Sequence, residues 1–187
     1  MKESIFEAME SSPLIPAVKN DEGLGKSLTC DQRVIFVLYG DICGIRDIVR
    51  EIRQHGKLAI VHADLIAGLG SKEAAVDYLH QIGADGIIST RPGFIKRGRE
   101  LGLFTIHRFF VFDSLSLQNV AKGASISHPD IVEILPGLMP KVIARVCQAV
   151  EAPVICGGLI EDKNDVMAAL GAGAMAISTT DQAVWDL

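Results

Sequence analysis

Eight short apolar runs, separated by helix-like segments, constrain the fold of this 187-residue chain more than any other feature. The runs are continuous and mostly lack alternation of apolar and polar residues, which is typical of parallel strands covered on both faces. They cover residues 14–18, 34–39, 58–62, 86–89, 103–110, 131–135, 154–156 and 174–178. Glycines close several of the intervening helices just before the next strand: Gly56, Gly83, Gly102 and Gly171.

Helical patterns fill most of the gaps between these runs, at residues 44–55, 71–82, 93–101, 114–122, 139–149 and 163–170. An acidic amphipathic helix is predicted at the start, in MKESIFEAMESSP. Only 19–33 is a poor helix pattern, so a loop or one short turn is expected there. The sequence predicts one α/β domain over residues 1–187, a small (β/α)8 barrel of TIM type. The alternative is a doubly wound open sheet, which the absence of GxGxxG after the first strand disfavours.

The segment 153–180 carries two consecutive strand-loop-helix units whose loops are suited to an anion. Gly157 and Gly158 follow the seventh run, where glycine permits positive φ and close approach of backbone N–H groups. Asp162 is predicted to cap the next helix. Hydroxyl side chains follow the eighth run, where a final helix is expected to begin: Ser178, Thr179 and Thr180. Paired loops of this kind after the last two strands form the phosphate site of many α/β barrels.

Composition excludes several classes of function. No apolar run approaches the ~18 residues that span a bilayer, and the start lacks the features of a signal peptide, so a cytoplasmic protein without membrane contact is expected. The four cysteines form no CxxC pair, which predicts reduced core thiols and no zinc site. The net charge of −5 gives no general attraction for nucleic acid, so any such binding needs a local basic face.

The carboxyl ends of the strands should hold the chemistry of a barrel. Lys19 and Arg108 are candidate anion partners there, and a charge inside the apolar strand TIHRFFVF is costly unless it is paired or functional. His62 and Asp64 lie two apart and should point the same way, with Glu133 at a later strand. This set could perform acid/base chemistry, bind a divalent metal or hydrogen-bond the hydroxyls of a polyol. No GxSxG or HExxH motif is present, and no cofactor is predicted.

Two clusters of basic residues are candidates for a nucleic-acid surface, although such clusters are usually solvated helix faces. One occupies a single face of the 44–55 helix: Arg46, Arg50 and Arg53. The other is the densest positive stretch of the chain, RPGFIKRGRE, which begins at a strand end and is ranked first: Arg91, Lys96, Arg97 and Arg99.

Long collinear blocks of the chain resemble the glycerol-3-phosphate-responsive antiterminators, regulators of glycerol uptake operons in Gram-positive and related bacteria. The resemblance covers nearly the whole chain, through SPLIPAVKN, VIFVLYGDI, HADLIAGLG, GADGIISTRPGFIKRGRELGL, HRFFVFDSLSL, PDIVEILPGLMPKVI and PVICGGLIEDKNDVMAALGAGAMAISTT. It implies a protein that binds sn-glycerol 3-phosphate and then the leader of an mRNA, preventing premature termination. The RNA role follows from the resemblance alone.

Such a ligand fits the residues already singled out. Its dianion suits the two glycines and the hydroxyl residues of the last two loops, with Arg108 as a further anion partner, and its hydroxyl groups suit Asp64, Glu133 or Lys19. A regulator without catalytic activity is therefore expected. The alternatives are an enzyme acting on a phosphorylated triose or polyol in the same pocket, and a scaffold with a vestigial pocket. The oligomeric state is not indicated by the sequence.

Overall fold

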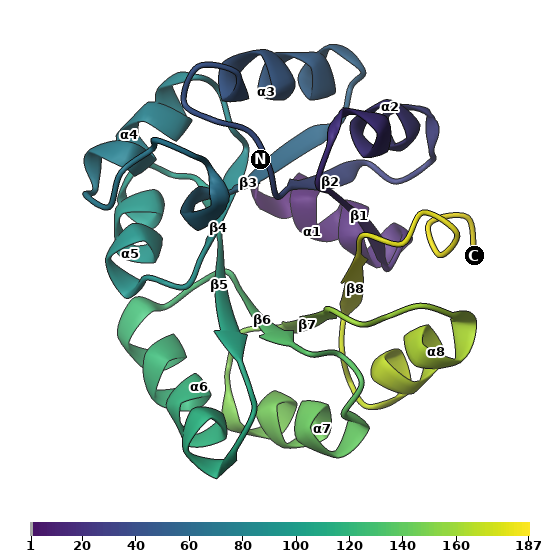
Figure 1. Cartoon of the computed structure of the whole chain (residues 1–187). Helices are drawn as coiled ribbons and strands as arrows, with labels where there is room; N and C mark the ends of the chain where they lie inside the picture. Colours follow the sequence, from purple (N-terminus) through teal and green to yellow (C-terminus); the bar gives the residue numbers. More distant parts are fainter. Residues whose placement is uncertain (1) are drawn as a thin grey trace.

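Eight parallel strands close into one barrel surrounded by helices in the computed structural model, which describes residues 2–187 (Figure 1). The strands are β1 (Leu14–Val18), β2 (Val34–Val37), β3 (Leu58–His62), β4 (Gly86–Ser89), β5 (Phe104–Phe110), β6 (Ile131–Leu135), β7 (Val154–Gly157) and β8 (Ala176–Thr179). Each strand pairs with its sequence neighbours, and β1 pairs with β8. The predicted (β/α)8 barrel of TIM type is confirmed, with every strand at or near its predicted position.

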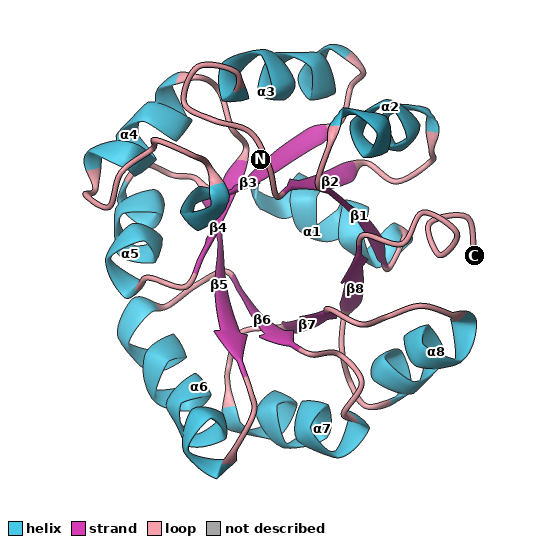
Figure 2. Cartoon of the chain, viewed as in Figure 1, coloured by secondary structure: helices cyan, strands magenta, loops and turns pink. Residues whose placement is uncertain are grey.

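The helices form an outer ring around the strands (Figure 2). They are α2 (Asp21–Thr29), α3 (Ile45–Gln54), α4 (Ala74–Gln81), α5 (Pro92–Glu100), α6 (Ser114–Ser127), α7 (Pro140–Ala149) and α8 (Lys163–Gly171), with a short 3-10 helix, η1 (Ala63–Leu65), after β3. Asp162 caps α8 as predicted, accepting from the backbone N–H of Asp165 at 2.9 Å. None of the helices in residues 2–187 is long and apolar enough to cross a membrane.

Alternate residues of each strand divide between two environments. On β3, Val61 packs outward with the surrounding helices, whereas Ile60 belongs to the cluster inside the barrel. The interior near the amino ends of the strands is apolar and filled, with Phe36 and Phe104 fully buried. The interior near the carboxyl ends is polar, because buried polar side chains such as Arg108 lie there. The open, polar end of the barrel is therefore the end formed by the carboxyl termini of the strands.

An N-terminal helix, α1 (Lys2–Ser11), closes the opposite end of the barrel (Figure 1). Its fully buried Ile5 and Met9 join the interior cluster, and the ring of Phe6 meets that of Phe104 edge-on, with 5.1 Å between centroids. The acidic amphipathic helix predicted from the sequence is thus confirmed. It acts as a plug, which leaves the carboxyl end as the only open end of the barrel in residues 2–187.

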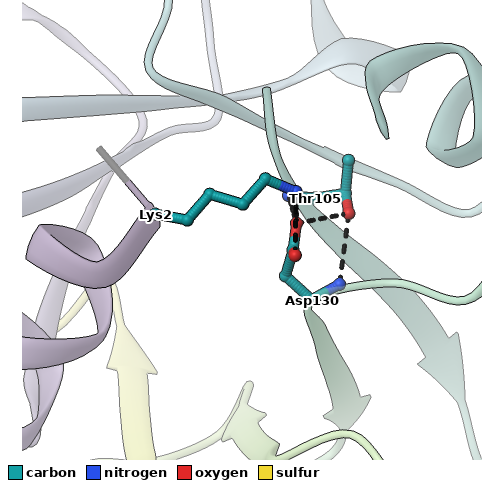
Figure 3. Close-up of polar contacts among 3 residues, drawn as sticks. All are labelled: Lys2, Thr105 and Asp130. Carbon is teal, nitrogen blue, oxygen red and sulfur yellow. Dashed lines mark hydrogen bonds and ion pairs between the residues drawn. The ribbon is translucent and has the colours of Figure 1, made fainter. Parts of the chain in front are cut away.

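A shared carboxylate fixes this plug to the barrel (Figure 3). The Lys2 ammonium donates to both oxygens of Asp130, at 2.8 and 2.7 Å. Asp130 also accepts hydrogen bonds from the backbone N–H and the hydroxyl of Thr105 at 2.9 and 2.8 Å. The same side chain therefore joins α1, the start of β5 and the turn before β6.

Two expectations about helices, one after β1 and one after β8, were wrong. Residues 21–29 form the helix α2 instead of a loop, because Asn20 caps the N-terminus by accepting from Gly23 N–H at 2.8 Å, and Leu24 is buried against the core. No final helix follows β8, where residues 182–186 form turns. There Trp185 anchors the chain, because its Nε1 donates to the backbone oxygen of Thr179 at 2.9 Å.

The cysteines also differ in part from the expectation of reduced core thiols. All four are free thiols, but only Cys156 is buried and Cys43 is exposed. Burial raises the pKa of the Cys156 thiol to about 12. Within residues 2–187, no group of three or more His, Cys, Asp or Glu side chains is arranged to hold a metal ion.

Candidate ligand-binding site

A pocket of about 660 Å³ lies at the open end of the barrel, between the ends of β1, β7 and β8. Six of the nine residues expected to bind a ligand line it: Lys19, Arg108, Gly158, Ser178, Thr179 and Thr180. The remaining lining comes from Ala17, Asn20, Glu22, Leu38, Leu135, Leu159, Ile160, Glu161, Asp181 and Gln182. The lining holds two cationic side chains and three carboxylates, so the pocket has no excess of positive charge. Selection of an anion must therefore depend on hydrogen-bond donors in the pocket.

Such donors are present in the loops after β7 and β8. The backbone N–H groups of Leu159, Ile160 and Thr180 donate no backbone hydrogen bond within residues 2–187. Gly158 has φ +76°, a conformation that favours glycine and lets the chain turn at the pocket. Clustered N–H groups in an irregular loop form a concavity suited to an anion. The loops lie where the two glycines and the hydroxyl run predicted them, and phosphate binding by them stays a prediction.

Thr179 connects these two loops. Its hydroxyl donates to the backbone oxygen of Ile160 and accepts from the N–H of Asp181, both at 3.0 Å. The side chain is 4 % exposed. The Thr179 hydroxyl thus joins the loop after β7 to the loop after β8. The neighbouring Thr180 is exposed.

A buried ionic network supports the pocket from inside the barrel. The Arg108 Nε donates to Glu133 Oε2 at 2.6 Å, and the Ser178 hydroxyl donates to Glu133 Oε1 at 2.7 Å. Glu133 is fully buried and does not line the pocket, whereas Arg108 does. Gly157 is beside this network, since a Cβ there would be 3.1 Å from Glu133 Oε1. Glu133 therefore holds Arg108 and Ser178 in place without lining the pocket, and the absence of a side chain at Gly157 leaves room for this network.

Asp64 is held at the end of β4 and does not line the pocket. Its carboxylate accepts from the Ser89 hydroxyl at 2.9 Å and from the N–H and hydroxyl of Thr90 at 2.7 and 3.0 Å. Arg91 pairs with the same carboxylate at 3.4 Å. The structure therefore gives Asp64 a role in shaping the β4–α5 loop and brings it into contact with the basic segment.

Two buried histidines lie on opposite faces of the barrel wall. His62 points inward at the top of β3, and its buried Nδ1 has no hydrogen-bond partner within residues 2–187. Burial, together with the nearby charge of Arg108, lowers the pKa of His62 to about 4. His107 points outward, with Nδ1 2.8 Å from the Ser127 hydroxyl, and burial lowers its pKa as well. Both rings are consequently neutral near pH 7.

The basic segment expected to bind RNA extends from the mouth along α5. Arg91 lies over the ring of Phe94, 5.0 Å from its centroid. Arg97 pairs with Asp77 at 2.6 Å and with Glu100 at 2.8 Å, which offsets its charge. Lys96 and Arg99 are exposed and form no ion pair within residues 2–187. Of the four basic residues of this segment, Lys96 and Arg99 therefore contribute most of its exposed positive charge.

The second basic cluster forms one surface, as its spacing predicts. Arg46, Arg50 and Arg53 line a shallow hollow of about 430 Å³ between α3 and α4. Arg50 pairs with Asp47 at 2.8 Å and Arg53 with Asp85 at 3.1 Å. Only Arg46 of the three is without an ion pair in the part of the chain that the structure describes.

Comparison with known proteins decides the family. Residues 14–185 match the model of the family described as glycerol-3-phosphate responsive antiterminator. The chain belongs to this family. A crystal structure of the glycerol uptake operon antiterminator regulatory protein from Listeria monocytogenes matches it with a TM-score of 0.90 and 32 % identity, over 94 % of this chain and 95 % of that one. The resemblance stated from the sequence is thereby confirmed.

Other relatives of this antiterminator-family protein extend the comparison. An antiterminator-related protein from Thermotoga maritima matches with a TM-score of 0.83 and 28 % identity, over 93 % of this chain and 98 % of that one. YgcP, an uncharacterized protein of Escherichia coli, is 42 % identical over 98 % of this chain and 96 % of its own. Orotidine 5′-phosphate decarboxylase from Pyrococcus horikoshii, 16 % identical with a TM-score of 0.72, shares the fold alone.

Several pocket residues were missed by reasoning from the sequence. Asn20 and Glu22 belong to the start of α2, which was expected to be a loop. Asp181 and Gln182 follow β8 in the segment expected to be helical. The capping signal of Asn20 before Asp21 and Glu22 could have located the first pair, because polar caps followed by acidic residues mark a helix start.

Proposed function

We propose that this protein is a metabolite-responsive regulator that binds sn-glycerol 3-phosphate at the barrel mouth and the leader of an mRNA. The observation that carries the ligand assignment is that three residues whose N–H groups donate no backbone hydrogen bond within residues 2–187, Leu159, Ile160 and Thr180, line one pocket with Arg108. A phosphate dianion would satisfy those donors and face a fixed positive charge. The family description names glycerol 3-phosphate and antitermination, which supports this phosphate ester as the ligand and a nascent RNA as the target.

The Arg108 side chain is prepared for this role. Its Nε is already used by Glu133, which fixes the plane of the guanidinium, and its position in the pocket lining leaves the outer nitrogens for a phosphate. Lys19 is exposed at the end of β1 and lines the same pocket. One buried, hydrogen-bonded cation and one exposed cation would thus meet the same anion.

Ligand binding can be tested with a charge reversal that leaves the backbone intact. Sn-glycerol 3-phosphate at 100 times Kd should stabilise the protein by about 2.7 kcal/mol in a thermal melt. Lys19→Glu should weaken this effect strongly, whereas the matched reversal Lys122→Glu, on an exposed lysine of α6 that lies outside the pocket, should preserve it. A melt of the parent protein that millimolar ligand does not move would reject the assignment. Gly158→Asp is a weaker probe, because φ +76° strains any side chain there.

The alternative is an enzyme acting on a phosphorylated triose or polyol in this pocket. Neutral His62 is the observation that favours it, because an unpaired imidazole at a barrel mouth can accept a proton. Incubation with glycerol 3-phosphate, triose phosphates and glycerophosphodiesters, with and without Mg²⁺, distinguishes the two. A regulator leaves these esters intact. Product in stoichiometric excess over protein, abolished in His62→Phe, would place the protein among the enzymes.

A further inference from the structure

His62 is a buried polar side chain that the fold leaves without a partner. It is 3 % exposed, and its Nδ1 makes no hydrogen bond within residues 2–187. A buried polar atom without a partner costs free energy, and such atoms often mark the place of a missing ligand. By contrast, the other buried strand histidine, His107, is hydrogen-bonded to Ser127. The two histidines therefore differ in what they need from their surroundings.

His62 faces the barrel interior, beside a residue that lines the pocket. On β3, Val61 packs outward and Ile60 inward, so the next residue in the alternation, His62, points into the barrel. The register pairs Val37 with Val61, which places Leu38 beside His62 at the same height. Leu38 lines the mouth pocket. His62 does not itself line the pocket, but it lies in the barrel interior beside Leu38, on the β2–β3 side, with its unpartnered Nδ1 buried there.

This side of the mouth lies across the barrel from the phosphate loops. Three strands separate β3 from β7 in one direction, and two separate β3 from β8 in the other. A ligand held by its phosphate at the N–H groups after β7 and β8 would extend its carbon chain over the barrel axis. Its far end would then approach β3.

The chemistry of the ring suits an alcohol better than a second anion. A neutral imidazole offers one donor and one acceptor, as a hydroxyl group does. Charged groups near the ring are Arg108 on β5, Asp64 after β3 and Glu133 on β6. Both carboxylates are already occupied, Asp64 by Ser89 and Thr90 and Glu133 by Arg108 and Ser178. Among these groups, His62 alone has an unused hydrogen-bonding position on a buried atom.

We infer that His62 recognises the hydroxyl groups of the phosphorylated polyol by hydrogen bonding, and so forms an alcohol subsite opposite the phosphate loops. This inference rests on the proposed function, because it requires a phosphate ester in the mouth pocket. It assigns recognition of the alcohol to His62, in place of the Asp64 and Glu133 carboxylates expected from the sequence. The phosphate would provide most of the binding affinity, and the imidazole would favour esters with hydroxyl groups over esters without them.

The test compares esters with and without hydroxyl groups. Calorimetric titration of the parent protein should show sn-glycerol 3-phosphate binding about tenfold more tightly than propyl phosphate, the gain of a buried hydrogen bond or two. In His62→Phe the two esters should bind within about twofold of each other, with the affinity for propyl phosphate preserved. His62→Asn, which places an amide near the position of Nδ1, should recover part of the preference. His107→Phe, which changes the other buried strand histidine, should retain all of it.

A spectroscopic readout separates contact from a merely structural role. The ¹⁵N chemical shifts of the His62 ring should move when sn-glycerol 3-phosphate is added and stay unchanged with propyl phosphate. A full preference for glycerol 3-phosphate in a folded His62→Phe protein would overturn the inference and leave the proposed function intact. Failure of the parent protein to bind either ester would overturn both.

Discussion

The Nε of Arg108 donates to Glu133 Oε2 at 2.6 Å, between residues that the register places directly opposite each other on β5 and β6. Both side chains are within the barrel, with 6 % and 0 % of their surfaces exposed. Removing two charges from water is costly, and a buried pair of this kind often contributes little net stability. Its value to this protein is a cation held at a defined place in the pocket.

Breaking this pair should be more damaging than replacing it. Glu133→Ala leaves the Arg108 charge buried without its partner and should lower the free energy of unfolding by about 3–5 kcal/mol. The double variant Arg108→Met with Glu133→Leu should recover most of that stability, yet show no stabilisation by glycerol 3-phosphate. Urea denaturation with and without the ligand measures both effects. If Glu133→Ala lowers the free energy of unfolding by less than about 1 kcal/mol, the buried Arg108 charge does not depend on Glu133.

The barrel wall makes a second prediction, at Gly86. A Cβ at this position would lie 2.5 Å from the backbone oxygen of Phe104 and 2.8 Å from Ile60 Cδ1, so β4 could approach its neighbours only with glycine there. Gly86→Ala should therefore destabilise the protein by about 1–3 kcal/mol in urea denaturation. The control is Gly25→Ala in α2, where no atom lies within 4 Å, and where alanine should be neutral or stabilise by up to about 1 kcal/mol. Equal effects of the two changes would remove the steric explanation.

The sequence predicted the barrel because its signals are local and repeated. Apolar runs such as 58–62 and 131–135 became strands with the predicted bounds, since a strand covered on both faces needs only continuous apolar residues. Residues 21–29 were misjudged because Gly23 and Gly25 lower helix propensity, while the cap at Asn20 and the burial of Leu24 stabilise the helix. Tertiary packing overrode propensity there.

The sequence predicted which residues lie near the carboxyl ends of the strands, but not which of them pair with one another. Strand-end positions placed Arg108, Glu133 and Asp64 toward the same end of the barrel, because every parallel strand of a barrel ends on the same side, but of the three only Arg108 lines the pocket. Which of them faces the pocket depends on pairing across strands: Glu133 is covered by Arg108, and Asp64 by the β4–α5 loop. No pattern within one strand reports a hydrogen bond to another strand.

The pH dependence of stability should report the buried state of His62. Burial first, and then the Arg108 charge, lower the pKa of this imidazole from 6.5 to about 4. The unfolded chain, with the ordinary value, binds a proton between those values while the folded protein does not, so stability falls as pH falls through that window. The parent protein should lose up to about 3 kcal/mol more than His62→Phe between about pH 7 and pH 4. Urea denaturation across that range measures the difference, and parallel curves for the two proteins would contradict it.

The surface proposed to meet RNA is the segment that starts at Arg91 and continues along α5. Arg91 pairs with Asp64 at the mouth, while Lys96 and Arg99 are exposed farther along the helix. One segment thus touches both the pocket end of the barrel and the outer surface. Coupling through it requires reciprocity, so leader RNA must tighten the ligand by the factor by which the ligand tightens RNA.

Replacing Lys96, Arg97 and Arg99 together with Ala should weaken leader RNA binding and reduce its salt dependence by about 0.7 log units for each RNA phosphate that the protein no longer neutralises. Most of the effect should come from Lys96 and Arg99, because Asp77 and Glu100 already offset the charge of Arg97. Stabilisation by glycerol 3-phosphate should survive the change, since none of the three residues lines the mouth pocket. The control is Arg46→Ala with Arg50→Ala on α3, which should leave the salt slope in place. If the α3 change alone reduces the slope, the RNA surface lies over the hollow between α3 and α4, and the α5 segment is a solvated helix face.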